Sequence, residues 1–153
     1  MDLLDSDIFV LDLRFQNDPR YPINKEFLEM GGRQRATTIY NLLEVCGILS
    51  FNLSHEALLT LYSEFSRRYT LSVIFPPVID HQSLSTMIRG VFEKITRKMT
   101  LGDAQILWIT EQHPEMERII SWNTKDFSGK SSLPVMTPQE WIVEQRANPP
   151  IRP

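Results

Sequence analysis

The 153 residues suit a single domain with a sizeable core, and 42% hydrophobic and 23% charged residues are typical of a globular protein. A net charge of −3 and a pI near 5.6 exclude general electrostatic adhesion to nucleic acid or acidic membranes, although local cations could still bind RNA. The single cysteine, Cys46, excludes an internal disulfide. With no signal peptide and no apolar run of bilayer length, we expect a soluble cytoplasmic protein.

The first residues combine a short apolar run with two carboxylates. Leu3 and Leu4 predict a buried strand, and Asp5 and Asp7 follow it at once. Because ligands of α/β proteins bind at the carboxyl ends of strands, Asp5 is a candidate site residue. The same residues could instead simply end the strand and cap a helix that continues to Phe15.

The next segment predicts two helices joined by a glycine pair. Asn24 can cap a short helix over residues 25–30. Beyond the glycines, Arg33 and Arg35 lead into the next helix, either as solvated charges or as contacts for a phosphate backbone. That helix, over residues 36–49, is apolar nearly all round, so we expect it to be buried.

Glu44 lies in the middle of this apolar helix. Burying an unpaired carboxylate costs several kcal/mol, so Glu44 should reach a cation or a polar partner, or hold a raised pKa. The alternative is a narrow solvated stripe that Glu44 shares with Asn41.

A second acidic position opens a later helix. Thr100 and Asp103 have the spacing of a capping box, and Gly102 between them permits close approach of the backbone, as a small site would need. Asp126 again follows a predicted strand, over residues 118–122. Asp103 therefore has both a capping interpretation and a functional one.

The other expected elements complete an alternation of strands and helices. They are a helix capped by Ser54, a strand over 71–75, an amphipathic helix over 83–98 with a basic end at Lys94, Arg97 and Lys98, a helix over 104–110, a strand over 134–136 and a last helix opened by Thr137 and Pro138. This alternation predicts an α/β fold with a mainly parallel sheet of four or five strands and helices on both faces. We expect one domain over residues 1–143 and a poorly ordered tail over 144–153.

In such a sheet, acids from separate segments can gather at one edge. The four candidates are Asp5, Glu44, Asp103 and Asp126. Clustered carboxylates repel one another, so they persist only with raised pKa values or bound cations. Oxygen ligands favour Mg²⁺ or Mn²⁺, and such sites position phosphate esters and activate water.

Taken together, these motifs resemble the PIN-domain family, in particular its small single-domain members typified by the VapC toxins. The resemblance rests on Leu4-Asp5-Ser6-Asp7-Ile8-Phe9, Leu42-Leu43-Glu44, Leu101-Gly102-Asp103-Ala104-Gln105-Ile106, Ser121-Trp122-Asn123-Thr124-Lys125-Asp126-Phe127 and Pro134-Val135-Met136-Thr137-Pro138-Gln139-Glu140-Trp141. It implies a three-layer α/β/α fold and a ribonuclease dependent on Mg²⁺ or Mn²⁺, with an RNA substrate, an antitoxin partner and a homodimer.

The resemblance matches the family's acids to Asp5, Glu44, Asp103 and Asp126, with two departures. Asp7 stands where the family usually has Asn, which adds a possible ligand. Ser121-Trp122-Asn123 replaces the usual Thr-x-Asp or Thr-x-Asn, so the fourth ligand is either Asn123 or Asp126. Candidate contacts for RNA are Arg33, Arg35, Arg97, Lys98 and Ser121.

Two other functions compete with this prediction. Asp5-Ser6-Asp7 with Lys98 and Gly102-Asp103 superficially resembles the haloacid-dehalogenase phosphatases, but Phe9 stands where those enzymes need a small or hydroxyl residue. A catalytically degenerate PIN domain that binds RNA or protein is the non-enzymatic alternative. RNA cleavage that depends on a divalent ion would separate the three.

Overall fold

The computed structural model describes residues 1–31 and 33–147. In this part of the chain a parallel sheet has the strand order β3-β2-β1-β4-β5. The strands are β1 (Asp2–Leu4), β2 (Arg35–Thr38), β3 (Ser72–Ile74), β4 (Arg118–Ile120) and β5 (Val135–Met136). The parallel α/β sheet expected from the sequence is confirmed, and β1 is its central strand.

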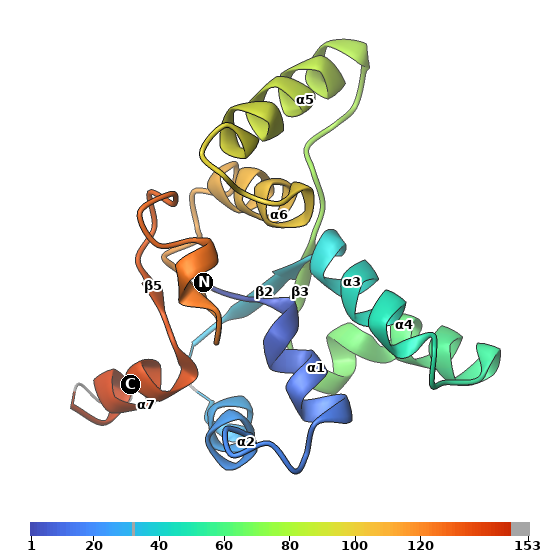
Figure 1. Cartoon of the computed structure of the whole chain (residues 1–153), viewed down its shortest axis with the longest axis vertical. Coiled ribbons are helices and arrows are strands. Elements are labelled where there is room, and N and C mark those ends of the chain that lie inside the picture. Colours follow the sequence, from blue (N-terminus) through green and yellow to red (C-terminus); the bar gives the residue numbers. More distant parts are fainter. Residues whose placement is uncertain (32, 148–153) are drawn as a thin grey trace.

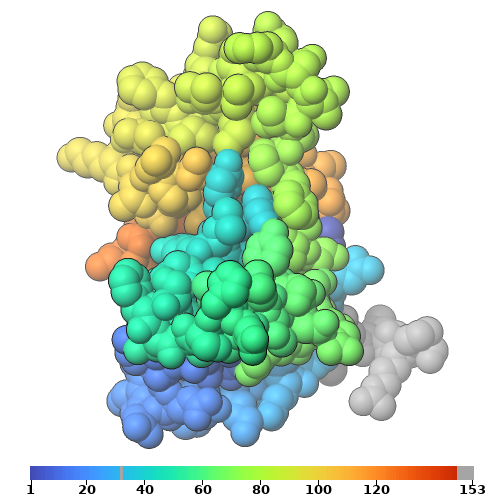
Figure 2. Space-filling model, turned by 90° about the vertical axis from the view of Figure 1, so that its right-hand side faces the viewer, coloured from blue at the N-terminus to red at the C-terminus, as the bar shows by residue number. Residues whose placement is uncertain are grey.

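Helices cover both faces of the sheet, which gives three layers (Figure 1). They are α1 (Ser6–Arg14), α2 (Tyr21–Glu29), α3 (Ile39–Leu49), α4 (His55–Tyr69), α5 (His81–Ile95), α6 (Leu101–Glu111) and α7 (Pro138–Ala147), with a short 3₁₀ turn η1 (Thr124–Asp126) after β4. Successive strand residues point to opposite faces, so Leu4 and Ile120 pack against α1 to α4 and α7, whereas Leu3 and Ile119 pack against α5 and α6. Figure 2 shows the side on which α3 and α4 lie between α5 above and α1 and α2 below.

Two local predictions were wrong. The helix expected from residue 36 begins only at Ile39, because Arg35–Thr38 forms strand β2 between β1 and β3. Asn24 lies inside α2, fully buried, rather than at its start. Both errors have the same cause: polar residues that face a tertiary partner carry no local pattern of a buried element.

The predicted helix starts at Ser54 and Thr100 are confirmed. Ser54 Oγ accepts a hydrogen bond from the backbone N–H of Ala57, and Thr100 Oγ1 accepts one from that of Asp103. The cap at Thr100 gives Asp103 a defined place in the first turn of α6.

The last helix, α7, runs through the domain boundary that we expected at residue 143. Residues 148–153 of the expected tail lie outside the described residues. Among the helices that the structure describes, none is long and apolar enough to cross a bilayer.

Candidate active site

Asp5 lies at the carboxyl end of the central strand, directly beside the end of β4. β1 pairs with β4 from Asp2 opposite Arg118 to Leu4 opposite Ile120, and the Asp5 backbone N–H donates to the Ile120 carbonyl (3.0 Å). This register brings Asp5 next to Ser121, 116 residues away, whose Oγ donates to Asp5 Oδ2 (2.7 Å). The edge predicted from the sequence is therefore where Asp5 lies.

Asp5 is 7% exposed, and both of its carboxylate oxygens accept hydrogen bonds. Oδ1 accepts hydrogen bonds from the backbone N–H of Ser6 (2.8 Å) and from Asn41 Nδ2 (2.9 Å). Burial, with the nearby charges of Asp7 and Glu44, raises its pKa to about 8, although the hydrogen bonds from Ser121 and Ser6 act against this. Near neutral pH this carboxyl group therefore holds a proton unless a cation is present.

Asp7, in the first turn of α1, forms the second half of an acid pair. Its Oδ2 accepts hydrogen bonds from Ser121 Oγ (3.1 Å) and the backbone N–H of Asn123 (3.0 Å). Its Oδ1 is buried and has no hydrogen-bond partner among the described residues. Burial raises the pKa of Asp7 to about 6, and hydrogen bonds from Ser121 and Asn123 limit the rise. The Ser121 hydroxyl thus joins two carboxylates that each prefer a proton or a cation.

Asn41 is a site residue that the sequence did not single out as one. It is fully buried, and its Oδ1 accepts from the backbone N–H (3.2 Å) and the hydroxyl (2.7 Å) of Thr38, the N-cap of α3. This capping box orients the amide so that Nδ2 donates to Asp5. The spacing of Thr38 and Asn41 could have indicated a capping box in the sequence. It was overlooked because the helix was expected to begin at residue 36, before Thr38.

Glu44 reaches the same cluster through a hydroxyl group. Ser6 Oγ donates to Glu44 Oε2 (2.8 Å) and lies 3.5 Å from Asp5 Oδ1. The expectation that this helix is buried nearly all round was wrong, because Glu44 is exposed and its neighbour Leu43 is 49% exposed. Glu44 thus has the polar partner that we expected, without being buried.

The later acids lie on elements that start at the same edge. The chain from α6 leads into β4, so the first turn of α6, with Asp103, is on the side where the strands end. The Asp103 Oδ2 accepts a hydrogen bond from Thr100 Oγ1 (2.6 Å). Asn123 Nδ2 donates to Asp126 Oδ2, which links both candidates for the fourth ligand. Within residues 1–31 and 33–147, no three His, Cys, Asp or Glu side chains are already placed to hold a metal ion.

Two of the predicted RNA contacts lie at the opposite edge. Arg35 opens β2 opposite Asp2, and its buried guanidinium donates to the carbonyls of Phe27, Leu28 and Met30 at the end of α2. Arg33 forms ion pairs with Asp2 and Glu117. These arginines close the amino-terminal edge of the sheet and do not line the acid cluster.

The other two predicted cations lie between α5 and α6. Arg97 and Lys98 are exposed, and the Lys98 carbonyl accepts from Lys130 Nζ (3.5 Å). Lys94, at the end of α5, is buried and forms an ion pair with Glu111 (2.5 Å). Ser121, the last of the predicted contacts, belongs to the acid cluster itself.

Comparisons with known proteins place the fold. No protein-family model matches the sequence, and no curated protein matches it. Among solved structures, the Mycobacterium tuberculosis toxin VapC20, described as cleaving the sarcin–ricin loop, is 13% identical, with a TM-score of 0.58 over 78% of this chain and 87% of that one. A chain of the FitAB complex bound to an IR36 DNA fragment is 16% identical, with a TM-score of 0.60 over 90% of this chain and 95% of that one. The chain therefore has the three-layer PIN-domain fold of the VapC type, as the motifs predicted.

Proposed function

We propose that this protein is a ribonuclease that hydrolyses RNA phosphodiester bonds with the help of Mg²⁺ or Mn²⁺, and that it is the toxin of a type II toxin–antitoxin pair. The observation that carries the proposal is the buried pair Asp5 and Asp7, joined by Ser121 at the carboxyl edge of a PIN-type sheet. The likeness to the sarcin–ricin loop cleaving toxin VapC20 supports RNA as the substrate class.

The residues at this edge fit a hard divalent cation. Among the described residues Asp7 Oδ1 is buried and has no hydrogen-bond partner, and burial is the main cause that raises the pKa values of Asp5 and Asp7, although the charge of Arg20 lowers that of Asp7. We assign the ion to Asp5, Asp7 and Glu44, completed by Asp103 and by Asp126 or Asn123. Bound there, Mg²⁺ or Mn²⁺ would supply charge that draws a phosphodiester to the carboxylates and activates water.

The surrounding polar side chains hold the acids in place. Asn41 Nδ2 donates a hydrogen bond to Asp5 Oδ1, and the Ser121 hydroxyl donates to Asp5 Oδ2 and Asp7 Oδ2. The Ser6 hydroxyl donates a hydrogen bond to Glu44 and also lies next to Asp5. These residues restrict the rotamers of the acids before a ligand binds, which lowers the cost of ordering them.

The partners follow from the same proposal. A toxin of this kind would act in the cytoplasm and be restrained by an antitoxin. We also propose a homodimer, because α5 exposes Leu84, Ile88, Phe92 and Ile95 at helical spacing, an apolar surface that a second copy could cover. The mass of the purified protein in solution tests this part.

The decisive experiment is RNA cleavage with Mg²⁺, with Mn²⁺ and with excess chelator, for the wild type and Asp5→Asn. We expect cleavage only by the wild type with a divalent ion. Activity that persists in chelator would end the metal mechanism. RNA binding without cleavage would favour the catalytically degenerate PIN domain. Hydrolysis of small phosphomonoesters would favour the phosphatase.

Asp103→Asn tests whether Asp103 is a ligand or only a capping residue. Loss of a charge in the first turn costs a few tenths to about 1 kcal/mol with or without metal. A ligand would also contribute to the stabilisation by Mg²⁺, which reaches about 2.7 kcal/mol at a hundredfold excess over the dissociation constant. We expect the shift in melting temperature caused by Mg²⁺ to shrink, and a full shift would remove Asp103 from the site.

A further inference from the structure

An RNA phosphate that approaches this acidic site needs a cation close to the cleavage position. Arg33 and Arg35 cannot supply it, because they lie at the other edge of the sheet. A cation close to the acid pair is Arg20, in the connection between α1 and α2. The Arg20 guanidinium lies over the ring of Trp122, which directly follows Ser121 of the acid cluster. Hydrogen bonds to Asp18, and to a smaller extent the charge of Asp7, raise the pKa of Arg20.

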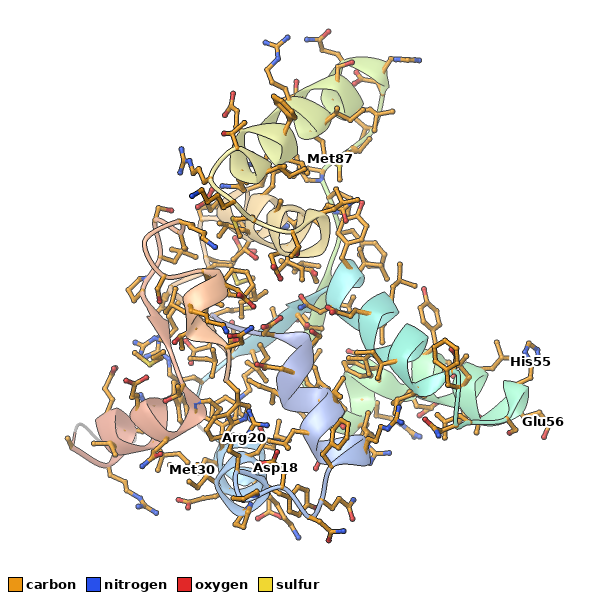
Figure 3. The ribbon with its side chains drawn as sticks, viewed as in Figure 1. Asp18, Arg20, Met30, His55, Glu56 and Met87 are labelled. Carbon is orange, nitrogen blue, oxygen red and sulfur yellow. The ribbon has the colours of Figure 1, made fainter. Side chains whose placement is uncertain are left out.

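A carboxylate holds one edge of the Arg20 guanidinium. Nε donates to Asp18 Oδ1 (2.9 Å) and Nη2 to Asp18 Oδ2 (2.7 Å), while the backbone N–H of Arg20 also donates to Oδ1 (2.8 Å). Figure 3 shows both residues together at this connection. Within the described part of the chain, Nη1 donates to no protein acceptor, and the side chain is 52% exposed. The outer edge of the fork is thus oriented and available.

An indole ring supports the guanidinium and ties it to the site. The Arg20 Cζ lies 5.8 Å from the centroid of the Trp122 ring. Trp122 Nε1 donates to Asn24 Oδ1 (2.8 Å), and the buried Asn24 amide donates to the Ile8 carbonyl (3.0 Å). Trp122 also directly follows Ser121, the residue that joins the two acids. The position of Arg20 is therefore coupled to α1, α2 and the end of β4.

We propose that Arg20 binds a backbone phosphate of the RNA beside the acid pair, through the outer edge of its guanidinium, with Trp122 as its support. This inference rests on the proposed ribonuclease function and names the residue that receives the substrate. A planar guanidinium presents paired N–H donors that match two phosphate oxygens, which a lysine ammonium does not. Asp18 orients the guanidinium through two hydrogen bonds, so the donors of the outer edge are directed toward the ligand.

The test is the affinity for a single-stranded oligoribonucleotide in chelator, where metal-dependent cleavage cannot occur. We compare wild type, Arg20→Ala, Arg20→Lys and the control Arg67→Ala over a series of salt concentrations. Arg67 is matched because it is also an exposed arginine paired with a carboxylate, Glu64, but it lies on α4. Melting temperatures establish that each variant is folded.

We expect Arg20→Ala to weaken binding at least about tenfold and to reduce the slope of log K against log salt by about 0.7, the value of one phosphate contact on a single strand. Arg20→Lys should keep the slope but bind with intermediate affinity, and Arg67→Ala should match wild type. Wild-type affinity in Arg20→Ala or Arg20→Lys, or an equal loss in Arg67→Ala, overturns this inference alone. A wild type that neither binds nor cuts RNA overturns the proposed function and the inference with it.

Discussion

In the absence of metal, the free energy of unfolding should fall as the pH rises from about 4 to about 8, and Asp5→Asn should remove most of the fall. Burial raises the pKa of Asp5 from 3.8 to about 8. Between these values the folded state retains a proton that the unfolded chain has released, so stability is greatest below the unfolded pKa and is lost as the pH approaches 8. Asp7 adds to the loss up to about pH 6.

The size of the effect follows from the shift. Each pKa unit corresponds to about 1.4 kcal/mol, so Asp5 can account for at most about 6 kcal/mol, a large part of the stability of a small domain. Asparagine can keep the local contacts, since its Oδ1 can accept from Ser6 and Asn41. Its Nδ2 would meet Ser121 Oγ, which can accept this bond while its proton turns toward Asp7.

Urea unfolding at pH 5 and pH 8 in chelator measures this difference for the wild type and Asp5→Asn. Asp12→Asn is the matched control, because Asp12 lies on α1, the helix that Asp5 caps, and accepts a hydrogen bond from Tyr69 rather than from the cluster. The free energy of unfolding of Asp12→Asn should decline with pH as that of the wild type does. A wild type as stable at pH 8 as at pH 5, or an Asp5→Asn protein with the full decline, would refute the reasoning.

Three further substitutions test single contacts. Glu44→Gln should change stability by less than about 1 kcal/mol because the side chain is exposed, yet reduce the stabilisation by Mg²⁺ seen in thermal unfolding. Asn24→Ala should cost about 2–4 kcal/mol in urea unfolding, because it leaves a backbone carbonyl and the Trp122 indole N–H without their partner. Gly90→Ala should cost about 1–3 kcal/mol by the same measurement, because its Cβ would come within 2.1 Å of Trp108 Nε1.

The sequence by itself determined the elements whose signal is local. The apolar run before Asp5 predicted β1, and hydroxyl residues at Ser54 and Thr100 predicted two helix starts that the structure has. The alternation of strands and helices predicted the parallel sheet, and ordered motifs predicted the PIN-type fold. These features are readable because periodicity and capping depend on residues within one or two turns of each other.

Only the tertiary structure decided which partners the polar side chains contact. Strand β2 is buried although three of its four residues are polar, because Thr37 Oγ1 donates to the Leu4 carbonyl and Arg35 meets the carbonyls at the end of α2. The register of β1 against β4 sets Ser121 between Asp5 and Asp7. Ser121 is more than a hundred residues from both acids, and no local pattern specifies the register that joins them.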